Sequence, residues 1–177
     1  MKFQKLLVIA AISCLLVGAS GAAMAGPELP TDSDCPLGII LNAAVNNLTV
    51  VNGDCLVRDS IIAGNVIVSN GPDDVFVMRE VVIGGSLEVR GGSVVITGAI
   101  LSSANFKVVG AVDTVVSDTL IESGNMIFRR NERLFIYRNV VNNGSIRCKN
   151  NIDLNGQRQE LATQNIVPSG VVTCFGQ

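Results

Sequence analysis

Residues 75–89 read VFVMREVVIGGSLEV, and residues 134–148 read LFIYRNVVNNGSIRC, which is nearly the same pattern 59 positions later. Related eight-residue segments begin at positions 55, 75, 94, 114, 134 and, more loosely, 154, so successive copies stand 19 or 20 residues apart. One further step back, the chain reads CPLGIILN from Cys35. Self-similarity at a fixed period of this size predicts a solenoid in which each repeat forms one coil.

A second marker runs in phase with the first and consists of a small residue, then Asn or Ser, then an apolar–x–apolar triplet. It reads GNVIV, GSLEV, ANFKV, GNMIF and GSIRC, with the Asn or Ser at positions 65, 86, 105, 125 and 145. Short runs of β-branched residues broken by Gly, Asn and Ser indicate short strands and tight turns, and a helical 3.6-residue period is absent. Left-handed hexapeptide coils prefer multiples of six residues. We therefore predict an all-β, single-domain right-handed parallel β-helix with about 20 residues per coil and roughly six coils.

The stacking of such coils assigns roles to individual positions. Coils lie about 4.8 Å apart, so equivalent residues become vertical neighbours. The Asn and Ser corner residues are predicted to stack as a polar ladder. Asp59 over Arg79 and Asp118 over Arg138 are predicted as ion pairs between adjacent coils. The predicted inward apolar columns contain Val66 and Val68, Leu87 and Val89, Phe106 and Val108, and Met126 and Phe128.

The first 25 residues have the features of a secretory signal peptide. Two lysines precede an apolar run over residues 6–17, and Ala23-Met24-Ala25 forms a small-residue cleavage site. The predicted organisation is a signal peptide over 1–25, an N-terminal lead-in over 26–34 and a β-helix domain over 35–174. We expect a secreted or periplasmic protein with no integral membrane segment after signal cleavage.

Four cysteines remain after cleavage, and an even number in an exported chain favours disulfides. Cys35 and Cys55 occupy the same repeat position one coil apart, and Cys148 can pair with Cys174 across the last coil. These bonds would close the two ends of the solenoid. The chain has no His and no paired C-x-x-C, so neither a metal site nor a cofactor is predicted.

The stretch NLTVVNGDCLVRDSIIAGNVIV, the recurring Gly-Asn-apolar corner and the ending IRCKNN…QNIV…TC resemble small exported bacterial right-handed β-helix repeat proteins, most of them uncharacterised. The resemblance covers residues 35–174 and implies the architecture without implying an activity. A more distant similarity to bactofilins, which are polymer-forming bacterial β-helices, rests on the coil pattern alone. Bactofilins are cytoplasmic and this chain has a signal and cysteines, so polymerisation is not carried over.

No catalytic residues are predicted. The absence of His excludes Ser-His-Asp and Cys-His nucleophilic sites, and no phosphate-binding or dinucleotide fingerprint is present. The best carboxylate pair is Asp73 and Asp74, with Glu88 nearby and Arg79 or Arg90 as a basic group. The surrounding NGPDDV has the composition of a solvated turn. A polysaccharide lyase or glycoside hydrolase therefore remains only the alternative.

Two surface features remain as candidate interaction sites. The first is a column that either faces outward as an apolar stripe or belongs to the core, since an apolar run does not reveal its facing; it contains Leu56, Phe76, Val95, Val115 and Phe135. The second is a basic patch that could meet an anionic ligand or simply be solvated; it contains Arg129, Arg130, Arg133, Arg138, Arg147 and Lys149.

Charge is unevenly distributed: residues 26–101 hold nine acidic and three basic residues, whereas residues 102–177 hold six and eight. No Trp and one Tyr leave little for base stacking, so nucleic acid is not an expected partner. We expect a non-catalytic structural or adhesive protein whose side faces serve self-association or bind an extracellular protein or polysaccharide. The alternative is a polysaccharide-binding or polysaccharide-cleaving protein similar to pectate lyases.

Overall fold

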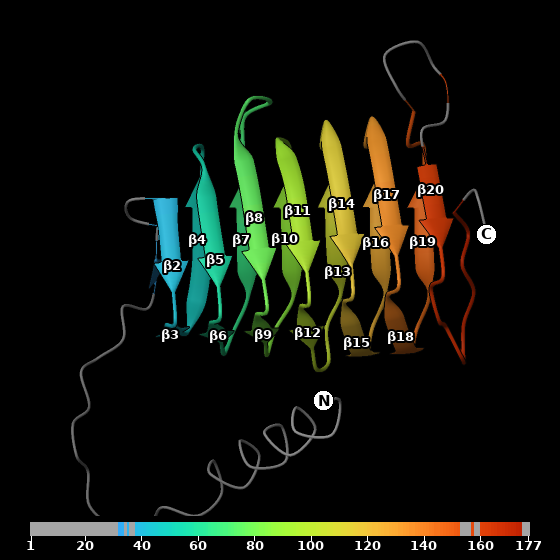
Figure 1. Cartoon of the computed structure of the whole chain (residues 1–177), viewed down its shortest axis with the longest axis horizontal. Helices are drawn as coiled ribbons and strands as arrows, with labels where there is room; N and C mark the ends of the chain where they lie inside the picture. The colour runs from blue at the N-terminus through green and yellow to red at the C-terminus, as the bar shows by residue number, and fades with distance from the viewer. Residues whose placement is uncertain (1–31, 34, 36–37, 153–156, 158–159, 175–177) are drawn as a thin grey trace, which may run out of the picture.

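The computed structural model describes residues 32–33, 35, 38–152, 157 and 160–174. They form a parallel β-solenoid of about six coils and three sheets, as predicted (Figure 1). The predicted signal peptide, residues 1–25, lies outside the described residues, as does most of the predicted lead-in. No helix in the described part of the chain is long and apolar enough to cross a membrane.

Each sheet takes one short strand from each coil. Sheet A contains β1 (Asp32–Ser33), β4 (Asn47–Val51), β7 (Val66–Ser69), β10 (Leu87–Arg90), β13 (Phe106–Val109), β16 (Met126–Arg129) and β19 (Ile146–Lys149). Sheet B contains β2 (Ile39–Leu41), β5 (Cys55–Arg58), β8 (Val75–Arg79), β11 (Ser93–Thr97), β14 (Asp113–Ser117), β17 (Arg133–Tyr137) and β20 (Glu160–Thr163). Sheet C contains β3 (Ala44–Val45), β6 (Ile61–Ile62), β9 (Val82–Ile83), β12 (Ile100–Leu101), β15 (Leu120–Ser123) and β18 (Val140–Asn143).

The chain winds as a right-handed helix. In Figure 1 the sheet B strands face the viewer and run downward, the sheet A strands behind them run upward, and successive coils advance to the right. Within each sheet, neighbouring strands are parallel and come from consecutive coils, as with β7, β10 and β13. Each coil therefore satisfies its backbone hydrogen bonds through the coils on either side.

The inward columns predicted for sheet A are confirmed. All eight of the predicted residues are fully buried. Leu87 lies between Val66 and Phe106, and Phe106 is followed by Met126 in the next coil. The rings of Phe106 and Phe128 lie 5.7 Å apart between centroids and are tilted relative to each other. The apolar–x–apolar triplet predicts this core because alternate residues of a strand point to opposite faces.

The register of sheet B differs from the prediction at one coil. Leu56 lies opposite Val77, 21 positions later, and Val77 lies opposite Val95, 18 positions later. Phe76 therefore lies between Cys55 and Val94 in the core, where it is fully buried. Its assignment to the column of Leu56 is wrong. The coil from Leu56 to Val77 is one residue longer than predicted and contains the corner at residues 70–74. Because successive strand residues face opposite sides, this one-residue shift moves a side chain to the other face.

The same shift changes the predicted ion pairs. Arg138 donates from Nη2 to Asp118 Oδ2 at 2.8 Å, which confirms that pair. The pair between Asp59 and Arg79 is wrong, because Arg79 lies opposite Arg58 in the register of β5 and β8. Arg58 instead contacts Asp59 within its own coil, with 2.9 Å between Nε and Oδ2.

The predicted polar ladder is present at the corner between sheets C and A. The backbone N–H of Asn65 donates to Asn47 Oδ1 at 2.9 Å, and that of Ser86 donates to Asn65 Oδ1 at 2.8 Å. The same bond links Asn125 to Asn105 at 3.1 Å. Glycine is required beside it, because a Cβ on Gly144 would overlap the carbonyl of the glycine in the preceding coil.

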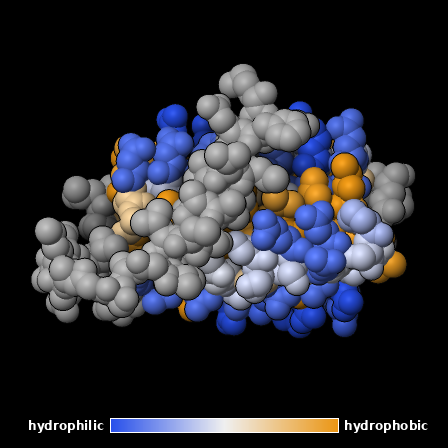
Figure 2. Space-filling model, turned by 90° about the horizontal axis from the view of Figure 1, so that it is seen from below, coloured by the Kyte–Doolittle hydropathy of each residue, from blue (hydrophilic) through white to orange (hydrophobic). Residues whose placement is uncertain are grey.

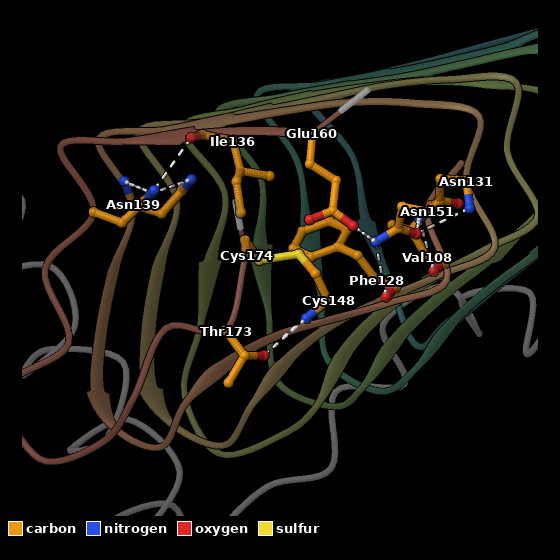
Figure 3. Close-up of a disulfide and its surroundings, with 11 residues drawn as sticks. Val108, Phe128, Asn131, Ile136, Asn139, Cys148, Asn151, Glu160, Thr173 and Cys174 are labelled. Atoms are coloured by element: carbon orange, nitrogen blue, oxygen red, sulfur yellow. Dashed lines mark hydrogen bonds between the residues drawn. A yellow bond between two sulfur atoms is a disulfide. The ribbon is translucent and has the colours of Figure 1, made fainter. Parts of the chain in front are cut away.

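Two further asparagine ladders occupy the other corners of the C-terminal coils, and the sequence did not predict them. At the corner between sheets A and B, the backbone N–H of Asn131 donates to Asn151 Oδ1 at 3.0 Å. At the corner between sheets B and C, Asn139 Nδ2 donates to the Val116 carbonyl at 3.0 Å. Asn131, Asn139 and Asn151 are fully buried (Figure 3). The side-chain oxygens of Asn131 and Asn139 accept from the corner N–H groups of Ala111 and Thr119, which the strands leave unpaired.

The cysteines form two disulfides, Cys35–Cys55 and Cys148–Cys174, with Cα separations of 6.1 and 5.0 Å. Cys35 is not the register neighbour of Cys55, because Ile39 pairs with Leu56 and the turn from Cys35 to Gly38 precedes that strand. Figure 3 shows the second disulfide between the two asparagine corners at the C-terminal end of the core.

Beside that disulfide, the inward column of Leu134 ends in a carboxylate. Glu160, which pairs with Leu134, accepts a 2.9 Å hydrogen bond from Asn151 Nδ2. A polar residue at this last inward position is consistent with an end cap, since solenoid ends need a polar termination.

Replacing Asn139 by Ala should lower the free energy of unfolding by about 3 kcal/mol. The change leaves the buried N–H of Thr119, which donates to Asn139 Oδ1, without its partner and also removes the hydrogen bond from Asn139 Nδ2 to the Val116 carbonyl. Asn143→Ala is the matched control, because its amide is exposed and donates only to the Glu122 carbonyl; a loss below about 0.5 kcal/mol is expected there. Equal losses in urea unfolding would contradict a structural role for this ladder.

Thr114→Val should stabilise the protein by about 1 kcal/mol. Thr114 is fully buried between Val94 and Leu134, and its hydroxyl has no hydrogen-bond partner in the described part of the chain. Valine has the same shape without the unpaired hydroxyl. Thr97→Val serves as the control. The Thr97 hydroxyl lies 3.3 Å from the Ser117 hydroxyl, so this change removes a hydrogen bond and should not stabilise the protein. A fall in melting temperature for Thr114→Val would overturn this reading.

Candidate functional site

The outward face of sheet B carries an apolar column along the length of the solenoid. Its residues pair in register from β2 to β20, and the structure places them outward, which resolves the facing left open by the sequence. Ile39, Phe135 and Leu161 are 52, 41 and 46% exposed, and the others are half-buried. This column, the sheet B stripe, contains Ile39, Leu56, Val77, Val95, Val115, Phe135 and Leu161.

The columns beside the sheet B stripe are polar but largely neutralised. Arg133 forms an ion pair with Asp113 of the preceding coil. On the other side, Arg138 lies over the Tyr137 ring, with Cζ 5.1 Å from the centroid, and also binds Asp118. The predicted basic residues Arg133 and Arg138 therefore belong to the margins of this face.

A second apolar ridge on sheet C was missed by the sequence reasoning. The first residue of each sheet C strand points outward and is apolar, and Ile166, which is bridged to Val140, continues this column. The column contains Ala44, Ile61, Val82, Ile100, Leu120, Val140 and Ile166. Figure 2 views this side and shows apolar surface among hydrophilic residues over the C-terminal coils. The sequence indicates this ridge through the apolar pairs II, VI, IL, LI and VV. Only one of two consecutive strand residues can face the core, so the other must be an apolar residue on the surface.

The predicted basic patch does not form one cluster. Arg129, Arg130 and Lys149 line a hollow of about 410 Å³ on the outward side of sheet A, and Arg90 and Lys107 join them there. These five cations define the basic hollow. Arg147 lies in the neighbouring outward column, beside Ile127. The sequence did not predict Arg90 and Lys107 as members, because they are 39 and 22 positions before Arg129 and meet it only through coil stacking.

Glu88 lies at the edge of the basic hollow and is held by two of its cations. Lys107 Nζ donates to Glu88 Oε1 at 2.9 Å, and Arg90 Nε donates to the same oxygen at 2.8 Å. The hydrogen bond from Lys107 is the main reason that the pKa of Glu88 lies below its ordinary value of 4.5; partial burial opposes it, and the Arg90 hydrogen bond adds to it. The carboxylate is therefore ionised at neutral pH.

The carboxylates considered for catalysis are not gathered around one centre. Asp74 Oδ2 accepts a 2.7 Å hydrogen bond from the backbone N–H of Gly71, and Asp73 is exposed in the same corner. Glu88 belongs to sheet A, whereas Arg79 extends from sheet B. No three His, Cys, Asp or Glu side chains within the described ranges are close enough to hold a metal ion.

No family model, curated protein or solved structure matches this chain. The architecture, a β-solenoid of about six coils, therefore rests on the structure itself, and the comparisons assign no family. The two disulfides indicate an oxidising compartment outside the cytoplasm.

Glu88→Gln should destabilise the protein at pH 7 and have little effect at low pH. The pKa of Glu88 is depressed in the folded state, so the contribution of its carboxylate to stability is present above pH 4.5 and is lost as the pH falls through the folded-state pKa. The difference at pH 7 should be at most about 1 kcal/mol, because the group is partly exposed. Urea unfolding of both proteins between pH 3 and 7 measures this. A difference that stayed constant over that range would contradict the ion-pair assignment.

Proposed function

We propose that this chain is a non-catalytic structural protein of the secreted or periplasmic space, and that its sheet B stripe binds a second copy of the chain. The observation that carries the proposal is the outward apolar column of seven residues on a regular sheet face. The disulfides at both ends support a rigid element that keeps its shape outside the cytoplasm.

The length of the sheet B stripe supports association. Seven residues on consecutive coils span roughly 29 Å at the usual strand spacing. Soluble monomers rarely leave continuous apolar surface of this kind uncovered. Two exposed side chains of the stripe, Phe135 and Leu161, are neighbours in β17 and β20, so they form the apolar centre of one end of the face.

Flat sheet faces offer a simple geometry for this contact. Two sheets packed face to face lie about 10 Å apart with interdigitating side chains, as in a β-sandwich. A contact between identical faces is closed by a two-fold axis, so each copy presents the same stripe to the other. The result would be a dimer whose core resembles the inside of a two-sheet domain.

Charge favours an antiparallel arrangement of the two copies. Position along the solenoid follows position in the sequence. Residues 38–101 hold six acidic and three basic residues, whereas residues 102–152 together with 160–174 hold five acidic and seven basic ones. The acidic and basic excesses of these described residues therefore fall toward opposite ends. With the copies antiparallel, the acidic coils of one face the basic coils of the other. Opposite potentials across a contact steer association and suppress the parallel arrangement.

The double substitution Phe135→Ser with Leu161→Ser should convert the wild-type assembly to monomer while the fold survives. Both side chains are nearly half exposed, so their loss removes contact surface more than core. Sedimentation velocity measures the assembly, and circular dichroism with thermal melting measures the fold. The matched control is Ile61→Ser with Ile166→Ser, which removes two comparably exposed residues from sheet C. The control should stay assembled.

A wild-type chain that sediments as a monomer would overturn the proposal, as would dissociation by the sheet C pair alone. Phe76→Ser provides a separate check on the register. Phe76 is fully buried in the adjacent inward column, so this single change should cost about 3–5 kcal/mol. It should lower the melting temperature strongly, whereas Phe135→Ser should not.

A further inference from the structure

The basic hollow lies along a line of cations that follows the axis of the solenoid. Arg90, Val109, Arg129 and Lys149 are register neighbours on four consecutive coils of sheet A. Arg130 stands at the following corner position, and Lys107 in the column beside them. Arg129 and Lys149 are therefore direct neighbours at the strand spacing of about 4.8 Å.

Three of the cations in the hollow differ from several arginines elsewhere in the protein, which are paired with acids. Arg58, Arg133 and Arg138 each have a carboxylate partner. By contrast, no carboxylate in the described part of the chain lies within ion-pair distance of Arg129, Arg130 or Lys149.

Glu88 is the one acid in the sheet A strands from β4 to β19, and Lys107 and Arg90 already hold it. Like charges directly opposite each other in a sheet are destabilising. Adjacent cations without carboxylate partners, such as Arg129 and Lys149, are expected where an anion is bound.

The shape of the hollow comes from one position in the line of cations that lacks a long side chain. Between Arg90 and Arg129 the column has Val109, which lines the hollow. Next to it, Gly110 has a positive φ of 68° and open space where a side chain would begin. The equivalent corner one coil earlier is also a glycine, Gly91, whereas the two following coils hold Arg130 and Asn150 at φ values of 56° and 55°. A short notch therefore crosses the line of cations.

We propose that the basic hollow binds a linear acidic polysaccharide whose sugars carry carboxylates. The chain would lie along the solenoid axis, with its carboxylates on Arg90, Arg129 and Lys149 and one sugar seated in the notch over Val109. Arginine suits this role because its planar guanidinium binds a carboxylate through two parallel hydrogen bonds. Asn150, which also lines the hollow, supplies an amide for sugar hydroxyls.

Three observations favour a glycan over other anions. The cations extend over four coils, which suits a chain polymer and exceeds what a single phosphate would contact. The hollow has no aromatic residue for base stacking, which single-stranded nucleic acids require. The disulfides indicate a compartment outside the cytoplasm, where acidic polysaccharides are encountered.

The test measures binding of the protein without its predicted signal peptide to polygalacturonate, by isothermal titration calorimetry at low salt. Fully methyl-esterified polygalacturonate is the matched ligand control, because it has the same backbone without the charges. Inorganic polyphosphate is the second control, because it is a linear polyanion that is not a sugar. Polygalacturonate should bind, binding should weaken with added salt, and neither control should bind comparably.

The double variant Arg129→Gln with Lys149→Gln should bind polygalacturonate at least about tenfold more weakly, which corresponds to the loss of two exposed charge contacts. Its melting temperature should equal or exceed that of the wild type, since like-charge repulsion is relieved. The matched control is Arg133→Gln with Arg138→Gln, which removes the same charge from nearby coils whose arginines already have acid partners. That control should bind as the wild type does.

A second pair of variants leaves the cations in place and changes only the notch. Gly110→Asp puts a carboxylate into it and should abolish binding, whereas Gly110→Asn, of the same size, should retain most of it. Asn52 and Asn150 already adopt a positive φ at the equivalent corner, so this position should accept either change.

Three outcomes would count against the proposal. Absence of polygalacturonate binding by the wild type overturns it, and so does equal weakening by the two double variants, which would reflect net charge alone. Equal affinity for polyphosphate overturns the assignment to a glycan. None of these results depends on the assembly state, because the hollow lies on sheet A and the sheet B stripe on another face.

Discussion

The stacking of each coil directly on the one before it is the constraint on which the rest of the structure depends. Parallel strands from successive coils are hydrogen-bonded about 4.8 Å apart, so a residue at a given position lies above its equivalent. Every inward position must then form a column of compatible side chains, as Leu87, Phe106 and Met126 do. The outward positions obey the same rule, so one apolar or charged residue per repeat becomes a continuous surface.

The corners of the solenoid accommodate the differences between coils. Strand positions are fixed by their neighbours, so differences in coil length are confined to turns such as residues 70–74. At the C-terminal corners, the side-chain oxygens of Asn131 and Asn139 accept hydrogen bonds from backbone N–H groups between strands and so continue the hydrogen bonding around the bend. Replacing a backbone partner by a side chain lets the chain turn sharply without burying an unpaired N–H.

The three faces of the solenoid offer different chemistry to solvent. Sheet B presents an apolar column with neutralised margins, sheet C a narrow apolar ridge, and the C-terminal half of sheet A a line of cations. Contact with a second copy through sheet B would leave the basic hollow on sheet A open. A rigid rod with separate faces could therefore bind two partners without moving, and this is the role that we propose for it.

The sequence by itself determined the solenoid, the length of its coils and the core of sheet A, because the apolar–x–apolar triplet recurs in a regular phase and a strand alternates its faces. It also indicated the cysteine pairs, because two of the four cysteines lie near the start of the repeats and two near the end. Only the tertiary structure decided that Phe76 is core and Val77 is surface, since one extra corner residue reverses the facing of a strand. The basic hollow likewise required the structure. Coil stacking pairs Arg133 and Arg138 with acids, so they do not belong to the hollow. The same stacking brings Arg90 and Lys107 beside Arg129. No local pattern in the sequence predicts which distant charges will meet.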